Sequence, residues 1–220
     1  MSEAVFLSLK VAALSTALAL PLGTGAALLL VRWRSPVRPL VDAAVNLPLV
    51  LPPLCTGYIL LILFGPRGPL GGLWSALGIA IPFTWIAAVL AAAVVSFPLM
   101  VRAAQVGFEA VDAGIEDAAR TLGASEADVF LSVTLPLAAR GIAAGAVLTF
   151  ARSLGEFGAT ILFAGSIAGE TRTIPLAIFH YFNIPGAEGK VHALMAVAVA
   201  LSLAAMLAAH WLVRPAGRRK

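Results

Sequence analysis

Residues 115–136 read IEDAARTLGASEADVFLSVTLP and separate two of the chain's long apolar runs. In the first half, small and apolar residues recur at i, i+3, i+4 and i+7, the spacing of one helix face. These residues are Ile115, Ala118, Ala119 and Leu122. Gly123 comes next, at a position where helices commonly end. The pattern predicts a short helix closed by a glycine turn.

The second half of this stretch has the signature of a second helix start. Ser125 and Asp128 stand three residues apart, the spacing of a capping box. We expect this second helix to stop before Pro136, because proline disrupts the hydrogen bonding of a helix interior. Two interpretations stay open. The stretch is either a hairpin that packs on neighbouring helices or a surface that docks a partner through the small residues Ala118 and Ala119.

The composition around this stretch is that of an integral membrane protein. Of the 220 residues, 60% are hydrophobic and 12% are charged, against about a quarter charged in a typical soluble domain. A helix needs about 20 apolar residues to cross a hydrocarbon core. Lipid offers no partners to unpaired backbone groups, so the spans should be helices. The sequence therefore predicts an all-α membrane protein.

Five apolar runs are long enough to cross a membrane. They cover residues 5–31, 41–64, 79–101, 141–165 and 191–213. The second run contains Pro48, Pro52 and Pro53, which should break its helix. Residues 174–182 are apolar but too short to cross, so we expect them to lie in the interface or to re-enter. A sixth span at this place is the alternative.

The long polar loop, residues 102–140, holds six of the chain's eleven carboxylates. With five spans, the loops on its side of the membrane carry ten basic residues and those on the other side carry four. Basic residues are enriched in cytoplasmic loops, so this count places the C-terminus inside and the N-terminus outside. Residues 1–220 then form a single transmembrane domain with a cytoplasmic loop. The ten are Arg32, Arg34, Arg38, Arg102, Arg120, Arg140, Arg214, Arg218, Arg219 and Lys220, and the four are Lys10, Arg67, Arg172 and Lys190.

The sequence shows no side-chain constellation for catalysis or metal binding. Cys55 is the one cysteine, which excludes an intrachain disulfide. His180, His192 and His210 are scattered without the spacing of metal ligands. Neither a nucleophile motif nor a phosphate-binding glycine loop is present. We therefore expect no enzymatic activity, no cofactor and no bound metal, and any ATP must be hydrolysed by another chain.

Arg152 and Glu156 are the charged residues expected deep in the fourth run. They stand four residues apart on one helix face, where they can pair. Counted from Gly141, Arg152 would lie about 16 Å along the helix, and an ionisable residue at such depth is a functional candidate. A structural ion pair and a pair that lines a transport pathway both fit. In the pathway, Glu156 would keep Arg152 from trapping an anion.

Two other features of the spans bear on packing and on the pathway. Gly141 and Gly145 form a small-residue face suited to close helix contact. Residues 48–57 should contain backbone groups that the prolines leave unpaired. Such groups are tolerated at membrane depth where they are buried in protein or line a wet cavity. We place this segment near the pathway, and a kink that only shapes packing is the alternative.

Residues 117–123 and 133–136 together resemble the docking loop of ABC importer permeases. The family pattern is Glu-Ala-Ala, three residues, Gly, nine residues, Ile, one residue and Leu-Pro. It is matched here with Asp117 in place of the acid and Val133 in place of the isoleucine. The resemblance implies the type I importer architecture, with a loop that docks on a cytoplasmic ATPase dimer. The positions carried over are Asp117, Ala118, Ala119, Gly123, Leu135 and Pro136.

Three further stretches are similar to oxyanion importers of this family. Residues 152–160, RSLGEFGAT, resemble the permeases for molybdate and sulfate. Residues 169–176, GETRTIPL, and 46–53, NLPLVLPP, resemble the molybdate branch. The resemblance implies a homodimer that moves molybdate, or the similar tungstate, with an external molybdate-binding protein. Residues 166–190 should face outside and could meet that protein.

Other functions compete with this one. A sulfate or thiosulfate permease would share the architecture, and a partner binding protein that holds sulfate but not molybdate would favour it. A channel or secondary transporter would act without an ATPase partner. An intramembrane enzyme would need a catalytic constellation that the sequence lacks.

Overall fold

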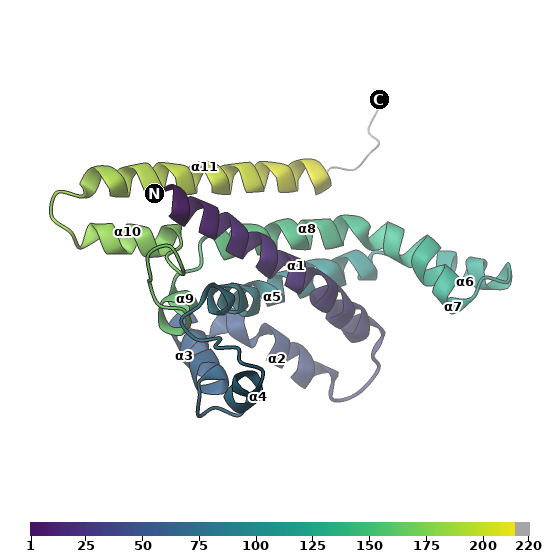
Figure 1. Cartoon of the computed structure of the whole chain (residues 1–220). Coiled ribbons are helices and arrows are strands. Elements are labelled where there is room, and N and C mark those ends of the chain that lie inside the picture. Colours follow the sequence, from purple (N-terminus) through teal and green to yellow (C-terminus); the bar gives the residue numbers. More distant parts are fainter. Residues whose placement is uncertain (214–220) are drawn as a thin grey trace.

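The computed structural model describes residues 1–213, and every regular element among them is a helix (Figure 1). The predicted basic tail, residues 214–220, lies outside the described residues. In chain order the elements are α1 Ser2–Arg32, α2 Arg38–Val50, α3 Pro53–Phe64, α4 Gly71–Ala76, α5 Trp85–Glu109, α6 Ala113–Thr121, α7 Glu126–Val129, the π-helical turn η1 Phe130–Thr134, α8 Leu135–Leu154, α9 Gly158–Phe163, α10 Ile174–Phe182 and α11 Glu188–Val213.

Within residues 1–213, five segments are long and apolar enough to cross a membrane, when the bent pair α2 and α3 is counted as one. The all-α class and the number of spans are therefore confirmed. The other four are Ser2–Arg32, Trp85–Glu109, Glu126–Leu154 and Glu188–Ala208. The predicted short segment is found as α10, whose nine residues reach about 14 Å. Within residues 1–213 it does not make a sixth span.

The predicted limits of the third and fourth spans are wrong. The third helix begins at Trp85 and runs on to Glu109, well into the predicted polar loop. The fourth begins at Glu126 and ends at Leu154, although residues 141–165 were predicted. The loop outside the long helices is therefore much shorter than residues 102–140. Polar side chains continue a helix readily once it has left the lipid, so hydropathy alone did not mark these ends.

The prediction that the loop's second helix stops before Pro136 is also wrong, because α7, η1 and α8 form one continuous helix. Proline lacks an N–H and crowds the carbonyl four residues back. The turn before Pro136 accommodates it by widening, so that the Leu135 N–H donates to the Phe130 carbonyl five residues back. Such π-helical turns occur inside α-helices, frequently at functional sites.

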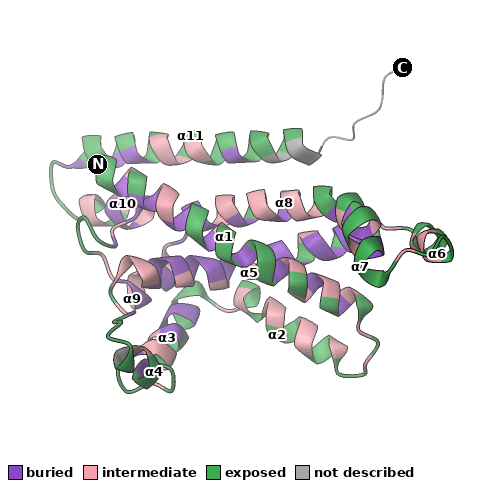
Figure 2. Ribbon diagram, turned by 45° about the vertical axis from the view of Figure 1, so that its right-hand side comes forward, coloured by how far each residue is buried: buried purple, intermediate pink, exposed green. Residues whose placement is uncertain are grey.

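Helix α5 is the centre of the bundle, with α1 and α8 packed along it. Most of its residues are buried (Figure 2), and in its apolar window the buried share is 61%, against 33% or less in the other three unbroken spans. Close contact depends on small residues: a Cβ on Gly141 would lie 2.6 Å from the Gly107 Cα of α5. One on Gly145 would lie 3.0 Å from the Met100 sulfur. The predicted role of Gly141 and Gly145 in close packing is confirmed.

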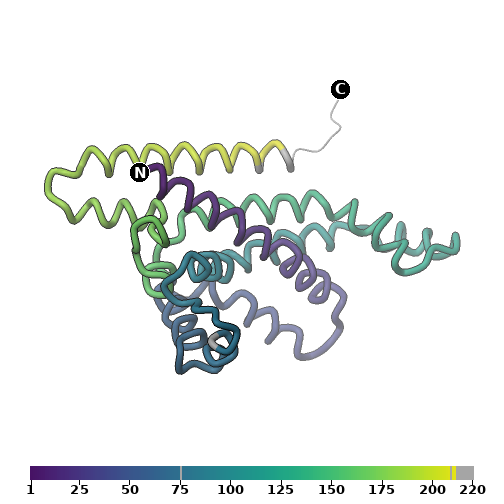
Figure 3. Tube along the Cα trace, in the orientation of Figure 1, coloured from purple at the N-terminus to yellow at the C-terminus, as the bar shows by residue number. Residues whose placement is uncertain are grey.

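The two ends of the bundle differ in what they carry. Helices α6 and α7 project at one end, where the last turn of α1 also lies (Figure 1). The N-terminus and the turn between α10 and α11 lie at the opposite end, and α11 then runs back toward the α6 end (Figure 3). The described chain thus begins at one end and finishes toward the other, as five crossings require.

Candidate functional site

The predicted docking loop consists of the short helix α6 and the start of the long helix that begins at Glu126, with a turn at Gly123 between them. Asp112 caps α6 by accepting a hydrogen bond from the Gly114 N–H at 2.8 Å. Gly123 follows the helix with φ +91°, a left-handed conformation that favours glycine. Ser125 Oγ accepts from the Asp128 N–H at 3.2 Å, and Asp128 Oδ2 accepts from the Ser125 N–H at 3.3 Å. The predicted capping box is confirmed.

Arg120 joins the two loop helices. Its guanidinium donates to Glu126 Oε1 at 2.7 Å and to Asp117 Oδ1 at 2.8 Å. Glu116 Oε2 lies 3.6 Å from Nη2. The hydrogen bonds to Glu126 and Asp117 hold the pKa of Arg120 above its usual value. The arginine thus fixes the angle between α6 and the helix that begins at Glu126.

The outer face of α6 is uncovered by the described chain. Leu122 is 88% exposed and Ile115 is 49% exposed. Ala118 is exposed, and the Asp117 side chain is 71% exposed. Exposed apolar side chains beside charged ones are typical of a surface that meets another protein. Of the other predicted docking residues, Gly123 and Pro136 are exposed, whereas Ala119 and Leu135 are half-buried.

The second candidate region is formed by two helix breaks inside the bundle. Helices α2 and α3 are bent by 112° at Leu51 and Pro52, and the α8 helix ends at Leu154 before α9 begins at Gly158. The two breaks touch. A Cβ on Gly158 would lie 2.7 Å from the Pro53 Cβ, and one on Gly57 would lie 2.5 Å from the Ala159 carbonyl oxygen. Glycine is required at both places by this close approach.

Arg152 and Glu156 lie at these breaks, and their predicted pairing is confirmed. Arg152 Nη1 lies 2.8 Å from Glu156 Oε2, with side-chain exposures of 32% and 2%. Glu156 Oε1 accepts from the Ala159 N–H at 2.9 Å. Among the described residues no N–H or O–H makes an aligned hydrogen bond to Oε2, so Arg152 holds this oxygen by charge and proximity. Arg152 belongs to the last turn of α8, not to the middle of a helix over residues 141–165.

An open cavity of about 370 Å³ adjoins this ion pair. It is lined from one break by Pro52, Pro53 and Leu54, and from the other by Arg152, Gly155, Glu156, Phe157 and Gly158. The proline-rich segment predicted near the pathway therefore shares one cavity with Arg152. The partly exposed guanidinium of Arg152 can attract an anion into this cavity, and the Glu156 carboxylate competes with that anion for the guanidinium.

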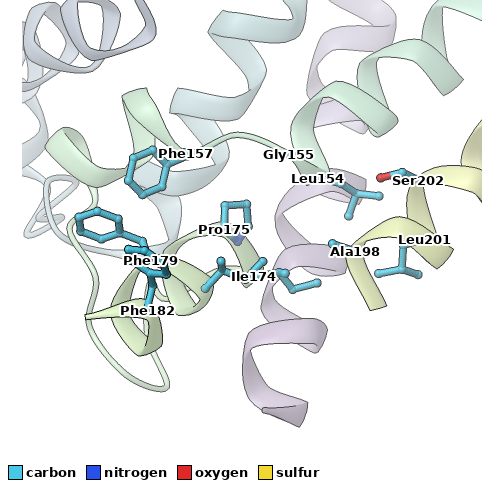
Figure 4. A pocket seen from close by; sticks show the side chains of 11 residues that line it. Leu154, Gly155, Phe157, Ile174, Pro175, Phe179, Phe182, Ala198, Leu201 and Ser202 are labelled. Carbon is cyan, nitrogen blue, oxygen red and sulfur yellow. The ribbon is translucent and has the colours of Figure 1, made fainter. Parts of the chain in front are cut away.

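A second, apolar hollow of about 390 Å³ lies next to this cavity, between α8, α10 and α11 (Figure 4). Phe157 packs on Phe179 of α10, with ring centroids 5.3 Å apart. Phe179 and Phe182 are 53% and 77% exposed. The hollow shares Gly155 and Phe157 with the polar cavity, so the two are neighbours.

The structure also shows a polar cluster between α2 and α5 that was not predicted. Arg102 Nη2 lies 2.9 Å from Asp42 Oδ2, and Arg102 Nε donates to Asn46 Oδ1 at 3.0 Å. Gln105, buried on α5, donates to Asp42 Oδ1 at 3.3 Å. No residue of α2 is fully buried, so this cluster is its main polar attachment. The sequence contains one indication of this cluster, because Asp42 is an isolated acid in a predicted apolar run and needs a polar partner.

Contacts between residues far apart in sequence were missed as well. Ser15 Oγ donates to Ser153 Oγ at 2.9 Å, and Ser153 Oγ to Ser96 Oγ at 3.2 Å, which joins α1, α8 and α5 in the buried interior. Glu116 contacts Arg32 and Thr134. Nothing local in the sequence marks these pairs. Among residues 1–213, no group of three or more His, Cys, Asp or Glu side chains is arranged to hold a metal ion.

Comparisons with known proteins point to one family. Residues 19–219 match the family described as "Binding-protein-dependent transport system inner membrane component". The chain is 51% identical over 213 residues to the molybdenum transport system permease protein ModB of Escherichia coli K12, which covers 96% of this chain and 93% of that protein. It is 38% identical over 194 residues to the sulfate transport system permease protein CysT of Salmonella typhimurium, covering 87% and 69%.

A solved structure of the MetNI methionine ABC transporter, in inward-facing conformations, has a TM-score of 0.77 with this chain at 18% identity. The match covers 99% of this chain and 96% of that one. At this identity the likeness shows a shared fold.

Proposed function

The chain belongs to the family of binding-protein-dependent transport system inner membrane components, and we propose that it is the permease through which an ATP-driven importer moves molybdate into the cytoplasm. A member of this family is a multi-pass inner membrane subunit that works with a substrate-binding protein and a separate ATPase. The chain itself is a transport subunit and not an enzyme. Membership of this family does not by itself specify the substrate.

The observation that supports molybdate as the substrate is the 51% identity to the Escherichia coli molybdenum permease over 96% of the chain. The sulfate permease is less similar and aligns over a smaller share of both proteins. Both substrates are tetrahedral dianions, so one guanidinium in the cavity suits either. We propose molybdate, with tungstate as a substrate of similar size and charge.

The outer face of α6 is the proposed docking surface for the ATPase. Leu122 and Ala118 offer apolar contact, while Asp117 adds a charge at the edge. Gly123, Leu135 and Pro136 shape the loop behind it. The projecting position of α6 and α7 at one end of the bundle supports this role (Figure 1). The same end then faces the cytoplasm, and the N-terminus and residues 166–190 face outside, where the binding protein acts.

The cavity at the two helix breaks is the proposed place where the anion passes. Arg152 attracts the dianion, and Glu156 weakens the attraction so that the anion leaves. A path for an ion of this size needs a second wall, and we propose that a second copy of the chain supplies it in a C2-symmetric homodimer. That copy would also cover the apolar hollow beside α10, because the hollow and the cavity share Gly155 and Phe157 in their walls. The other apolar faces of the helices would meet lipid.

Reconstitution tests this function directly. The chain, its ATPase and its binding protein are placed in proteoliposomes, and entry of labelled molybdate is measured with an excess of unlabelled sulfate or molybdate. We expect uptake that needs ATP and binding protein, and that molybdate but not sulfate suppresses. Equal suppression by sulfate would assign the sulfate function. Uptake without an ATPase would assign a channel or secondary transporter.

A further inference from the structure

Two adjacent acids of α6, Glu116 and Asp117, differ in exposure and in their other partners, although both lie beside Arg120. The Asp117 side chain is 71% exposed and contacts Arg120 of its own helix. The Glu116 side chain is 16% exposed and points toward the bundle. Of the two, Asp117 occupies the position of the acid in the docking-loop pattern. Glu116 therefore needs a different explanation.

Glu116 is bonded to two other elements and to Arg120 of its own helix. Its Oε1 accepts hydrogen bonds from the Thr134 hydroxyl in η1 and from Arg32 Nη2, at 3.3 Å, in the last turn of α1. Its Oε2 lies 3.6 Å from Arg120 Nη2. A carboxylate can accept from a hydroxyl and a guanidinium at once, and bonds to an ionised acceptor are the stronger kind. This one side chain links α6 to α1 and to the α7–α8 helix.

Thr134 is well placed to receive a movement of α6. It is 3% exposed and lies at the end of the widened π-helical turn. The helix continues without a break from there to Leu154, so its last turn carries Arg152. Eighteen residues separate Thr134 from Arg152, about 27 Å at 1.5 Å per residue. A displacement at Thr134 therefore moves the wall of the polar cavity.

We propose that Glu116 is the positioning residue that carries the movement of α6 into α8 and α1, while Asp117 and Leu122 face the ATPase. This inference rests on the proposed function, because it takes the ATPase as the source of the movement. Glu116 holds the moving helix to two spans at once. Without it, α6 still docks and stays joined to the start of the α7–α8 helix through Arg120 and Glu126, but its displacement no longer acts at Thr134 and Arg32, so much less of it reaches the cavity.

The first test compares variants that remove the link with variants that preserve it. Glu116→Ala and Thr134→Val remove the link, whereas Thr134→Ser keeps the hydroxyl, and Asp117→Ala is the neighbouring control. Complexes in proteoliposomes are assayed for retained ATPase, ATP hydrolysis and molybdate moved per ATP. We expect Glu116→Ala and Thr134→Val to keep the ATPase and to move at least tenfold less molybdate per ATP. Thr134→Ser should move as much as wild type, and Asp117→Ala should lower the amount of retained ATPase.

A merely structural role would lower the retained ATPase and the total ATP hydrolysis through loss of folded protein, and would leave the molybdate moved per ATP by the remaining complexes unchanged. Unchanged molybdate per ATP in Glu116→Ala would overturn the proposal, as would loss of the ATPase to the level of Asp117→Ala. Failure of the proposed function is separable, since it would show in the wild-type complex as ATP hydrolysis without molybdate entry.

Cys55 provides a second readout that needs no substrate. It is the chain's one cysteine, it is exposed, and it follows Leu54 in the wall of the cavity. Thiol labelling is followed with and without nucleotide in wild type, Glu116→Ala and Thr134→Ser. We expect the nucleotide-dependent change in labelling rate to become much smaller in Glu116→Ala and to persist in Thr134→Ser. The same change in Glu116→Ala as in wild type would refute the transmission through Glu116.

Discussion

Arg120 and Arg152 are almost equally exposed, at 34% and 32% of the side chain, yet they are held in opposite ways. Arg120 sits between three carboxylates, Glu116, Asp117 and Glu126, at the projecting end of the bundle. Arg152 has one carboxylate, Glu156, which is 2% exposed within the membrane-spanning part. Arg120 thus belongs to a network of several carboxylates, whereas Arg152 forms an ion pair with a single carboxylate.

A single substitution should therefore change the stability of the protein more at the Arg152 pair than in the Arg120 network. Exposed ion pairs contribute about 0–1 kcal/mol each, so the Arg120 network shapes the loop more than it stabilises the fold. Removal of one partner from a buried pair is far more costly, because the other charge stays in a medium of low polarity.

The largest effect is expected from Arg152→Ala, which leaves the Glu156 carboxylate buried without a counter-charge. Loss of one partner of a buried pair costs about 3–5 kcal/mol, so we expect a strong fall in the thermal stability of the purified protein. Glu156→Gln should lower the stability less. The glutamine carbonyl can still accept the hydrogen bond from the Ala159 N–H, and the Arg152 side chain that loses its counter-charge is 32% exposed.

A double-variant cycle provides the control. Arg152→Ala combined with Glu156→Gln should be more stable than Arg152→Ala alone, because the uncompensated charge is gone. A double variant as unstable as the single one would contradict the assignment of an exclusive pair.

A second large effect is expected from Gly57→Ala, which tests the contact of the two helix breaks. The new Cβ would lie 2.5 Å from the Ala159 carbonyl oxygen, and overpacking costs about 1–3 kcal/mol. We expect lower stability and lower molybdate uptake. Gly25→Ala in α1 is the matched control, because nothing lies within 4 Å of its Cβ. If the two variants had the same stability and the same molybdate uptake, close contact between the two helix breaks would not be needed.

A smaller effect, confined to assembly, is expected from Leu122→Glu at the docking end. Burial of a leucine contributes about 1.5–3 kcal/mol, and each 1.4 kcal/mol is about tenfold in affinity. We therefore expect at least tenfold less ATPase to co-purify, with the permease's own thermal stability unchanged. Leu122→Met keeps an apolar side chain and should retain the ATPase. Normal co-purification by Leu122→Glu would remove this face from the docking surface.

The smallest effect is expected from Ser125→Ala, which removes one half of the capping box. Loss of such a cap costs about 1 kcal/mol, so hydrogen exchange at the Asp128 amide should quicken about fivefold while the rest of the bundle stays protected. Ser125→Thr keeps the hydroxyl and should exchange as wild type does. Faster exchange throughout the bundle would mean that the loop is not an independent unit.

The two regions also differ in how far the sequence revealed them. At the docking end the contacts are local: Ser125 with Asp128, Arg120 with Asp117, and Gly123 at its own turn. Periodicity and capping rules act over three to seven residues, so they correctly predicted the capping box and the turn at Gly123, whereas the contact of Arg120 with Asp117 was not predicted. Arg152 and Glu156 were found for the same reason, as an i, i+4 pair.

What the sequence did not reveal depends on distant contacts. The approach of Gly57 to Ala159 and the bond from Thr134 to Glu116 join segments with no local relation. The limits of the long helices were missed for a different reason. Hydropathy measures contact with lipid, whereas the helix through Pro136 is continued by a widened turn that no composition rule marks.

The central claim is that one end of the chain docks the ATPase while the helix breaks conduct the anion. The most direct test measures molybdate moved per ATP hydrolysed by the Glu156→Gln complex, with its retained ATPase determined on the same proteoliposomes. We predict a full complement of ATPase and continued ATP hydrolysis with clearly less molybdate moved per ATP, because Arg152 would then hold the anion. Wild-type molybdate transport per ATP in this variant would contradict the claim.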